Sequence, residues 1–186
     1  MATTSNVRQG FYLVYNGEPY VVVGTDFMKK AQSTGMLRTT IRNMLNGKVL
    51  KITLRSGETV EAADISRGKA TYLYEDETNC HFMDSKSFEQ FFLSIESIGD
   101  KKDFLKENQE VDVLLYNDNP VAIDLPKKLV LTVTETEPAT RGDTAQGSVM
   151  KPATLETGME IQVPLFVKKD DKIRINTDTR QYVERA

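Results

Sequence analysis

The chain has 186 residues, with 24 lysines and arginines, 27 aspartates and glutamates and one histidine, so its formal net charge is −3. Its 39% hydrophobic and 27% charged residues are typical of a globular protein and exclude a disordered chain. No apolar run reaches the ~18 residues of a membrane span, and residues 1–6 lack the features of a secretory signal. The single cysteine, Cys80, excludes an intramolecular disulfide and a cysteine-cluster zinc site. We therefore expect a cytoplasmic protein with no membrane partner, no metal and no cofactor.

Short strand signals dominate the chain. Residues 11–15 and 20–23 predict a hairpin, because the pair Asn16 and Gly17 between them supplies the positive φ angles of a tight turn. Further strands are predicted, in chain order, at residues 36–44, 48–54, 71–74, 80–83, 111–116, 121–125, 129–136, 159–163, 173–175 and 182–183.

Helix signals are sparse. Asp100 can cap a helix over residues 101–108, with Phe104 and Leu105 on its buried side. Residues 88–92 predict a further short helical turn. Strands that recur every ~8–12 residues with so little helix favour an all-β fold of small barrels over an α/β sheet.

Breaks in the strand pattern predict three domains, at residues 1–65, 66–128 and 129–186, each near the lower size limit for an independent core. The first carries 8 basic and 5 acidic residues, the second 8 and 13, and the third 8 and 9. A mildly basic first domain therefore precedes an acidic second one. A polyanion would meet the first domain with the least repulsion.

The residues predict no catalytic centre. The chain contains no glycine-rich phosphate loop, no nucleophile elbow and no metalloprotease histidine pair. His81 adjoins Cys80 in a predicted strand, and because strand neighbours point to opposite faces, the two cannot form a catalytic dyad. We expect a half-buried sheet histidine, and a solvated hairpin tip at the acidic residues 75–77. A binding protein is favoured over an enzyme.

Two polar loops are the candidate binding segments. Residues 28–36 form either an ordinary exposed hairpin or a projecting finger whose lysines meet phosphates. Residues 141–148 are small and bounded by glycine, and form either a flexible linker or a loop that brings backbone close to single-stranded RNA.

Several motifs resemble those of bacterial elongation factor P. The most specific is the block KPATLETGMEIQVPLFV at residues 151–167, which is similar to the C-terminal signature of that family. The sequence GDTA at residues 142–145 matches the loop that precedes the signature. Shorter matches lie at residues 17–20, 71–74, 81–83 and 88–90, so that the resemblance covers essentially the whole chain.

The resemblance implies an all-β fold of three small barrels in tandem, a KOW/SH3-like barrel followed by two OB-fold barrels, in an L-shaped mimic of tRNA. It implies a monomer that is not an enzyme and that binds the ribosome, both its RNA and its proteins, between the peptidyl and exit tRNA sites. Such a factor would hold the end of the peptidyl-site tRNA productively when consecutive prolines stall peptide-bond formation.

The same resemblance implies which residues contact RNA. The tip loop would reach toward the peptidyl-tRNA end, while basic side chains behind it neutralise phosphates and two parts of the last domain contact RNA. These are Lys29, Lys30, Ala31, Gln32 and Ser33 at the tip, Arg38 and Arg42 behind it, the loop residues Arg141, Gly142, Asp143, Thr144 and Ala145, and the C-terminal Tyr182 and Arg185.

The tip departs from the family pattern. Family members commonly carry a lysine that is extended after translation, and a gap-free alignment places Gln32 at that position. A carboxamide has no nucleophilic amine, so lysine-directed extension of Gln32 is excluded. Lys30 would lie about two residues, ~6–7 Å, from the tip.

Three hypotheses follow. The chain is a translation factor with an unmodified glutamine tip, or a divergent paralogue that binds the ribosome in a regulatory role without lysine-dependent stimulation. A general single-stranded nucleic-acid binder is disfavoured, because residues 66–128 are too acidic for a stacking and phosphate-binding face.

Overall fold

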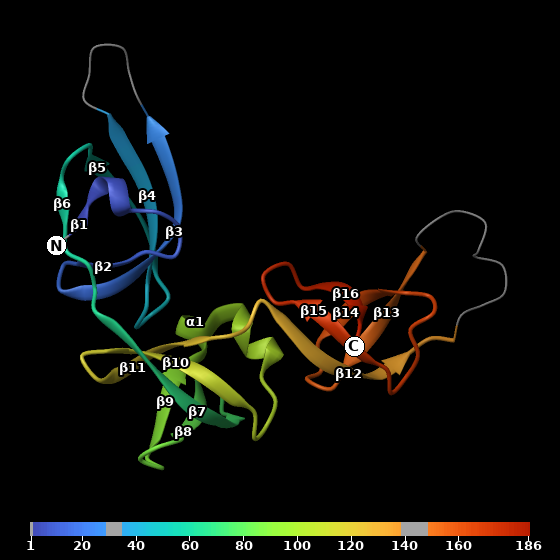
Figure 1. Cartoon of the computed structure of the whole chain (residues 1–186). Helices are drawn as coiled ribbons and strands as arrows, with labels where there is room; N and C mark the ends of the chain where they lie inside the picture. Colours follow the sequence, from blue (N-terminus) through green and yellow to red (C-terminus); the bar gives the residue numbers. More distant parts are fainter. Residues whose placement is uncertain (1, 29–34, 139–148) are drawn as a thin grey trace. The chain divides into compact units, whose positions relative to one another are not determined.

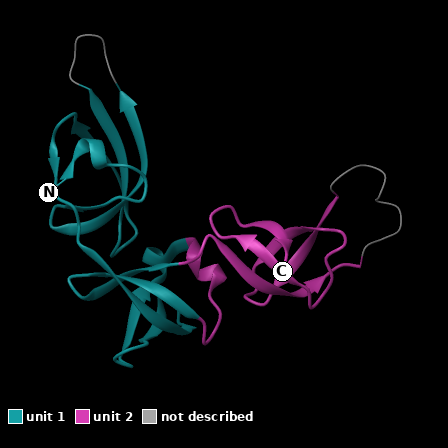
Figure 2. Ribbon diagram, viewed as in Figure 1, with its two compact units in different colours: residues 1–99, 110–124 teal, residues 100–109, 125–186 magenta. Residues whose placement is uncertain are grey.

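The structure is a computed structural model that describes residues 2–28, 35–138 and 149–186 (Figure 1). Two compact units are present, one of residues 1–99 and 110–124 and the other of residues 100–109 and 125–186 (Figure 2). Strands dominate both units, which confirms the predicted all-β fold. Within the described ranges, no helix is both long and apolar enough to cross a membrane.

The first sheet belongs to the first unit and is antiparallel throughout. Asn16 and Gly17 have φ angles of 51° and 82°, which confirms the predicted hairpin turn. A bulge between Val22 and Gly24 lets a long strand bend over the core. The strands, in sheet order, are β2 (Tyr12–Tyr15), β3 (Glu18–Met28), β4 (Met36–Asn43) and β5 (Val49–Arg55), and a small separate pair joins β1 (Ala2–Thr3) to β6 (Thr59–Val60) beside a 3₁₀ turn, η1 (Thr4–Asn6).

The second sheet also belongs to the first unit. Its inner face carries a row of aromatic rings, in which Phe82 lies between Tyr72 and Phe91 with centroids 5.5 Å from each. Buried Met44 packs against Leu114 of this sheet, so one apolar cluster spans both sheets. The strands, in sheet order, are β11 (Asn119–Asp124), β10 (Glu110–Tyr116), β7 (Ile65–Glu75), β8 (Asn79–Asp84) and β9 (Gln90–Ser94), followed in the chain by the helix α1 (Ile95–Ile98).

The second unit contains one sheet and the turn that precedes it in the chain. Phe104, at the end of the 3₁₀ segment η2 (Gly99–Phe104), is buried in the core of this sheet. Lys106 Nζ lies 2.6 Å from a carboxylate oxygen of Glu156, which ties the same turn to the sheet. The strands, in sheet order, are β14 (Glu160–Pro164), β13 (Met150–Leu155), β12 (Lys128–Thr136), β15 (Lys172–Asn176) and β16 (Gln181–Arg185).

The helix predictions were wrong in detail. Residues 88–92 do not form a helical turn, because Gln90–Ser94 pairs with β8 as β9. The α-helix lies earlier than predicted, at α1, where the Ser94 hydroxyl accepts the N–H of Ser97 and Gly99 ends the helix with a φ of 59°. Of residues 101–108, the first four belong to the 3₁₀ segment η2 and none to an α-helix, although Phe104 and Leu105 are buried as expected.

The strand β13 was not predicted, because Pro152 interrupts the pattern. Pro152 lies one position before Ala153, the first residue of β13 that pairs with β12. At the proline, β13 has a neighbour only on the β14 side, through Gln162. The missing N–H is therefore tolerated at the start of the strand.

Candidate functional site

The hairpin of β3 and β4 carries the predicted tip. The last described pair is Met28 with Met36, and Figure 1 shows the two strands side by side up to the segment drawn in grey. The predicted tip residues, Lys29, Lys30, Ala31, Gln32 and Ser33, lie outside the described residues.

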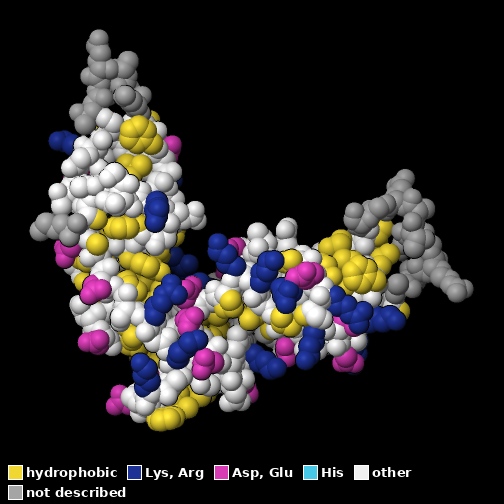
Figure 3. Space-filling model, viewed as in Figure 1, with side chains coloured by type: hydrophobic (Ala, Val, Ile, Leu, Met, Phe, Trp, Pro, Cys, Tyr) yellow, Lys and Arg dark blue, Asp and Glu magenta, His cyan; other side chains and the backbone are white. Residues whose placement is uncertain are grey.

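Apolar side chains surround the described end of this hairpin. Phe27 is 59% exposed and Met36 is 46% exposed, although both belong to paired strands. The Phe27 ring packs over Gly35, where a Cβ would lie 2.7 Å from Cζ of the ring. Figure 3 shows hydrophobic side chains at this end of the hairpin. The arrangement places an exposed aromatic ring at the described end of the hairpin.

A hollow of about 480 Å³ lies on the β3–β4–β5 sheet below the hairpin end. Arg38 and Lys51 line it, and the strand register places Arg38 between Asp26 and Thr53. Gly24 also lines it, and a Cβ there would meet no atom within 4 Å. The two cations and the threonine hydroxyls of the lining can bind phosphate groups of RNA, although the carboxylate of Asp26 also lines the hollow.

Arg42 is held by the first unit itself. Its guanidinium Nη2 donates to the carbonyl oxygens of Glu96 and Ser97, at 3.1 and 3.3 Å. Gly99 makes room for this contact, since a Cβ there would lie 2.6 Å from Nη2. The cation therefore caps the carbonyl end of α1, where positive charge is favoured. Arg38 and Arg42, predicted as a pair, have different surroundings.

The second predicted loop, with Arg141, Gly142, Asp143, Thr144 and Ala145, lies outside the described residues, and only its base can be described. Lys151 is buried at 6% exposure, and its Nζ donates to the carbonyl oxygen of Glu137 at 2.5 Å. The Thr136 hydroxyl donates to the carbonyl oxygen of Pro152 at 3.0 Å. These bonds fix the strand ends from which the loop leaves.

The predicted C-terminal contacts lie on one sheet edge of the second unit. Tyr182, on β16, meets the ring of Phe166 edge-on, with centroids 6.4 Å apart. Phe166 is 59% exposed, whereas Tyr182 is partly buried against the core, so the exposed aromatic surface is mainly that of Phe166. Arg185 is paired with Asp171 at 2.8 Å. Phe166 lies within the signature block at residues 151–167 but was not among the residues predicted to contact RNA.

His81 and Cys80 have the predicted arrangement. The His81 side chain is 22% exposed and its Nε2 lies 2.6 Å from Asp76 Oδ2, whereas Cys80 is fully buried on the other face of β8. Among the described residues, no group of three or more histidines, cysteines or carboxylates is placed to hold a metal ion.

Three family models match the chain in succession. They describe the KOW-like domain of elongation factor P at residues 3–60, its OB domain at residues 65–123, and the C-terminal part of elongation factor P at residues 129–185. The KOW-like and OB assignments agree with the barrel types that the resemblance implied.

Full-length relatives agree with this result. The chain is 42% identical to elongation factor P of Thermosipho africanus and 43% identical to that of Oleidesulfovibrio alaskensis, in each case over the whole of both chains. It is 37% identical to elongation factor P 2 of Protochlamydia amoebophila, over 99% of this chain and 97% of the relative.

A solved structure shows the same kind of fold. Eukaryotic translation initiation factor 5A from Methanococcus jannaschii matches with a TM-score of 0.51 and 18% identity, covering 66% of this chain and 90% of that one. The family models and the full-length relatives together establish that the chain belongs to the elongation factor P family of translation elongation factors.

Proposed function

We propose that this chain binds the ribosome between the peptidyl and exit tRNA sites and stimulates peptide-bond formation at consecutive prolines, with an unmodified glutamine at its tip. The observation that supports this proposal is the full-length sequence similarity to elongation factor P. Gln32 replaces the lysine that many family members extend, and its amide donates hydrogen bonds to RNA without an added group.

The factor works by positioning. Proline is a rigid and poor substrate, and holding the peptidyl-tRNA end in a reactive geometry lowers the entropic part of the barrier. The ribosome forms the bond, and this chain provides the contact surface at the tip. We propose that it acts as a cytoplasmic monomer, with domains at residues 1–65, 66–128 and 129–186.

The basic side chains contribute unequally to RNA binding. Arg38, with Lys51 beside it in the same hollow, contacts phosphates of the tRNA or ribosomal RNA. Arg42 adds less, since its guanidinium already donates to two carbonyl oxygens. In the last domain, Tyr182 and the loop at residues 141–145 contact RNA, and Arg185 adds less charge because Asp171 already pairs with it.

Intact mass and activity test this proposal together. The mass of the native protein should equal that of the bare sequence, allowing for removal of the first methionine. The purified chain should then relieve a stall at consecutive prolines in a reconstituted translation system. An added group on Lys29 or Lys30 would show that a lysine, and not Gln32, is the working residue.

A regulatory paralogue is the second candidate. The chain is 37% identical to one relative named elongation factor P 2. This candidate predicts ribosome binding without relief of the stall. A second gene with a lysine tip in the same genome would favour it.

A further inference from the structure

Three aromatic side chains form a row across the outer face of the second sheet. The strand register places His81 of β8 opposite Tyr74 of β7 and Phe92 of β9. The rings of Tyr74 and His81 are stacked, with centroids 4.5 Å apart and planes at 19°, and the Phe92 ring lies 6.2 Å from His81. Tyr74 is 49% exposed and Phe92 is 63% exposed. The row is an aromatic surface on a solvent-exposed sheet face.

Side chains on the inner face of the same strands fill the core of this sheet. The rings of the outer row are therefore not part of that core. Tyr72, Phe82 and Phe91 fill the inner face, and Phe82 is fully buried. A half-exposed aromatic ring keeps apolar surface in contact with water, and a partner that covers this surface gains hydrophobic free energy. The outer row therefore has the character of a contact surface.

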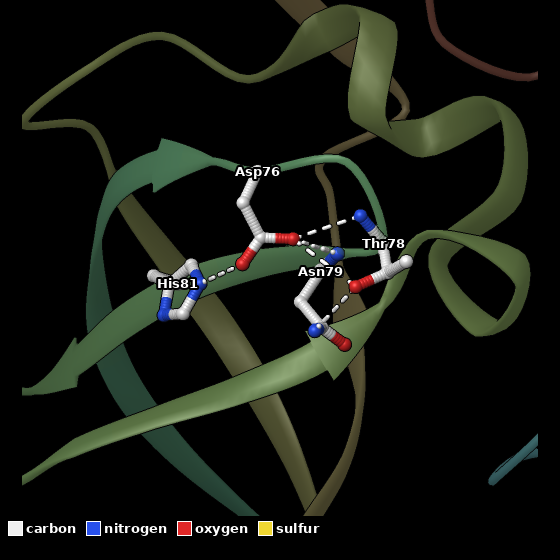
Figure 4. A network of polar contacts seen from close by, with 4 residues as sticks. All are labelled: Asp76, Thr78, Asn79 and His81. Atoms are coloured by element: carbon white, nitrogen blue, oxygen red, sulfur yellow. Dashed lines mark hydrogen bonds and ion pairs between the residues drawn. The ribbon is translucent and has the colours of Figure 1, made fainter.

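Asp76 fixes the central ring of the row (Figure 4). Its Oδ2 accepts from His81 Nε2 at 2.6 Å, and its Oδ1 accepts from the backbone N–H groups of Thr78 and Asn79, both at 2.8 Å. The hydrogen bond from His81, followed by those from the two backbone groups, holds the pKa of Asp76 well below its usual range. The carboxylate beside the row is therefore ionised at neutral pH.

The charge around the row disfavours nucleic acid. The turn at residues 75–77 carries three consecutive carboxylates and adjoins the row directly. Residues 66–128 as a whole carry 13 acidic against 8 basic groups. Aromatic platforms that stack bases need basic neighbours for the phosphates, and this surface has the opposite charge.

We propose that the row of Tyr74, His81 and Phe92, with the acidic turn at residues 75–77, binds an arginine-bearing basic segment of a partner protein. A guanidinium is planar and stacks on aromatic rings, while its N–H groups pair with carboxylates in the same plane. The row offers the rings, and Glu77 of the turn offers a carboxylate, whereas Asp76 already accepts from His81, Thr78 and Asn79. None of these residues is among those proposed to contact RNA, so the role goes beyond the proposed activity and its test needs no ribosome.

Peptide binding to the purified full-length chain tests the proposal. The probes are a fluorescent peptide of alternating arginine and glycine, the same peptide with lysine for arginine, and single-stranded oligouridylate. We expect the arginine peptide to bind about fivefold tighter than the lysine peptide, because stacking favours the guanidinium. The double variant Tyr74→Ser and Phe92→Ser should weaken arginine-peptide binding about tenfold, and Glu77→Gln about threefold at low salt.

A matched variant separates the row from general exposed aromatic surface. Phe88 is 70% exposed in the turn after β8, outside the row, and has a φ of 58° that asparagine tolerates. Phe88→Asn should bind the arginine peptide like the unchanged chain. Far-ultraviolet circular dichroism and the urea midpoint check that every variant is folded.

Three results would overturn the proposal. Equal affinity for the arginine and lysine peptides, unchanged in the double serine variant, would mean that only net charge attracts them. Tighter binding of oligouridylate than of the arginine peptide, abolished by the serine substitutions, would make the row a nucleic-acid platform. Concentration-dependent self-association that the serine variant loses would make a second copy of this chain the occupant.

Discussion

A Cβ at Gly47 would lie 2.4 Å from the carbonyl oxygen of Glu96, so the turn after β4 and the helix α1 meet through bare backbone. Two segments distant in the sequence approach each other here because one of them lacks a side chain. Gly47 also has a φ of 71°, which most residues avoid. The guanidinium of Arg42 donates to the same carbonyl oxygen of Glu96.

Gly47→Ala should therefore destabilise the chain more than the same change at another left-handed glycine. Gly57 has a φ of 85°, but a Cβ there would meet no atom within 4 Å, so Gly57→Ala reports the backbone strain alone. We expect a loss of about 1 kcal/mol for Gly57→Ala and about 2–4 kcal/mol for Gly47→Ala, because the clash adds to the strain. Urea unfolding measures both, and equal losses would contradict the tight contact.

Arg42 and Arg38 should separate into a structural and a binding role. Arg42→Met removes a charged donor to two carbonyl oxygens and should lower the free energy of unfolding by about 1–2 kcal/mol. Arg38→Met should leave stability nearly unchanged but weaken ribosome binding and reduce its salt dependence by about one counterion. Sedimentation with ribosomes at several salt concentrations measures this, and a stability loss confined to Arg38→Met would refute the division.

Asp76 makes the fold sensitive to acid. Its pKa is lowered in the folded chain, so the ionised carboxylate stabilises the fold above the unfolded pKa of about 3.9. That contribution is lost as the pH falls from about 4 toward the lower folded value. Asp76→Asn should therefore reduce the fall in the free energy of unfolding at acid pH, which we call the acid limb of the stability curve. Part of this fall should remain.

The remaining part has an identified source in Asp84. Backbone N–H groups of Ser87 and Lys86 lower the pKa of Asp84 in the same sense. Asp84→Asn should remove a separate part of the acid limb, and the double variant should flatten it further. Urea midpoints between pH 2 and pH 6 give the curves, and an unaltered slope in Asp76→Asn would show that its hydrogen bonds do not persist in solution.

Local chemistry made much of the fold predictable. The Asn16 and Gly17 pair specified its hairpin through backbone conformation alone, and alternating apolar residues identified most strands. The failures arose where neighbours outweighed local signals. Residues 88–92 resembled a helical turn, but pairing with β8 satisfies their backbone, and Pro152 concealed a strand that begins at the edge of its ladder.

Arg38 and Arg42 were selected from the sequence as candidate RNA contacts, but their surroundings could not be predicted from it. Arg38 and Arg42 have the same charge and lie four residues apart, and only tertiary structure shows that Arg42 faces the carbonyl end of α1. Lys51 was missed because its place opposite Thr40 depends on strand register. The row of Tyr74, His81 and Phe92 likewise exists only through register across three strands.

We propose that the glutamine-tipped chain relieves proline stalls without modification. The most direct test of this claim is the rate of synthesis through a run of consecutive prolines in a reconstituted system, using protein whose mass equals that of the bare sequence. We predict that the chain raises this rate by about tenfold, and that Gln32→Ala loses most of the gain while a message without proline runs is unaffected. An unchanged rate, or full activity in Gln32→Ala, would contradict the claim.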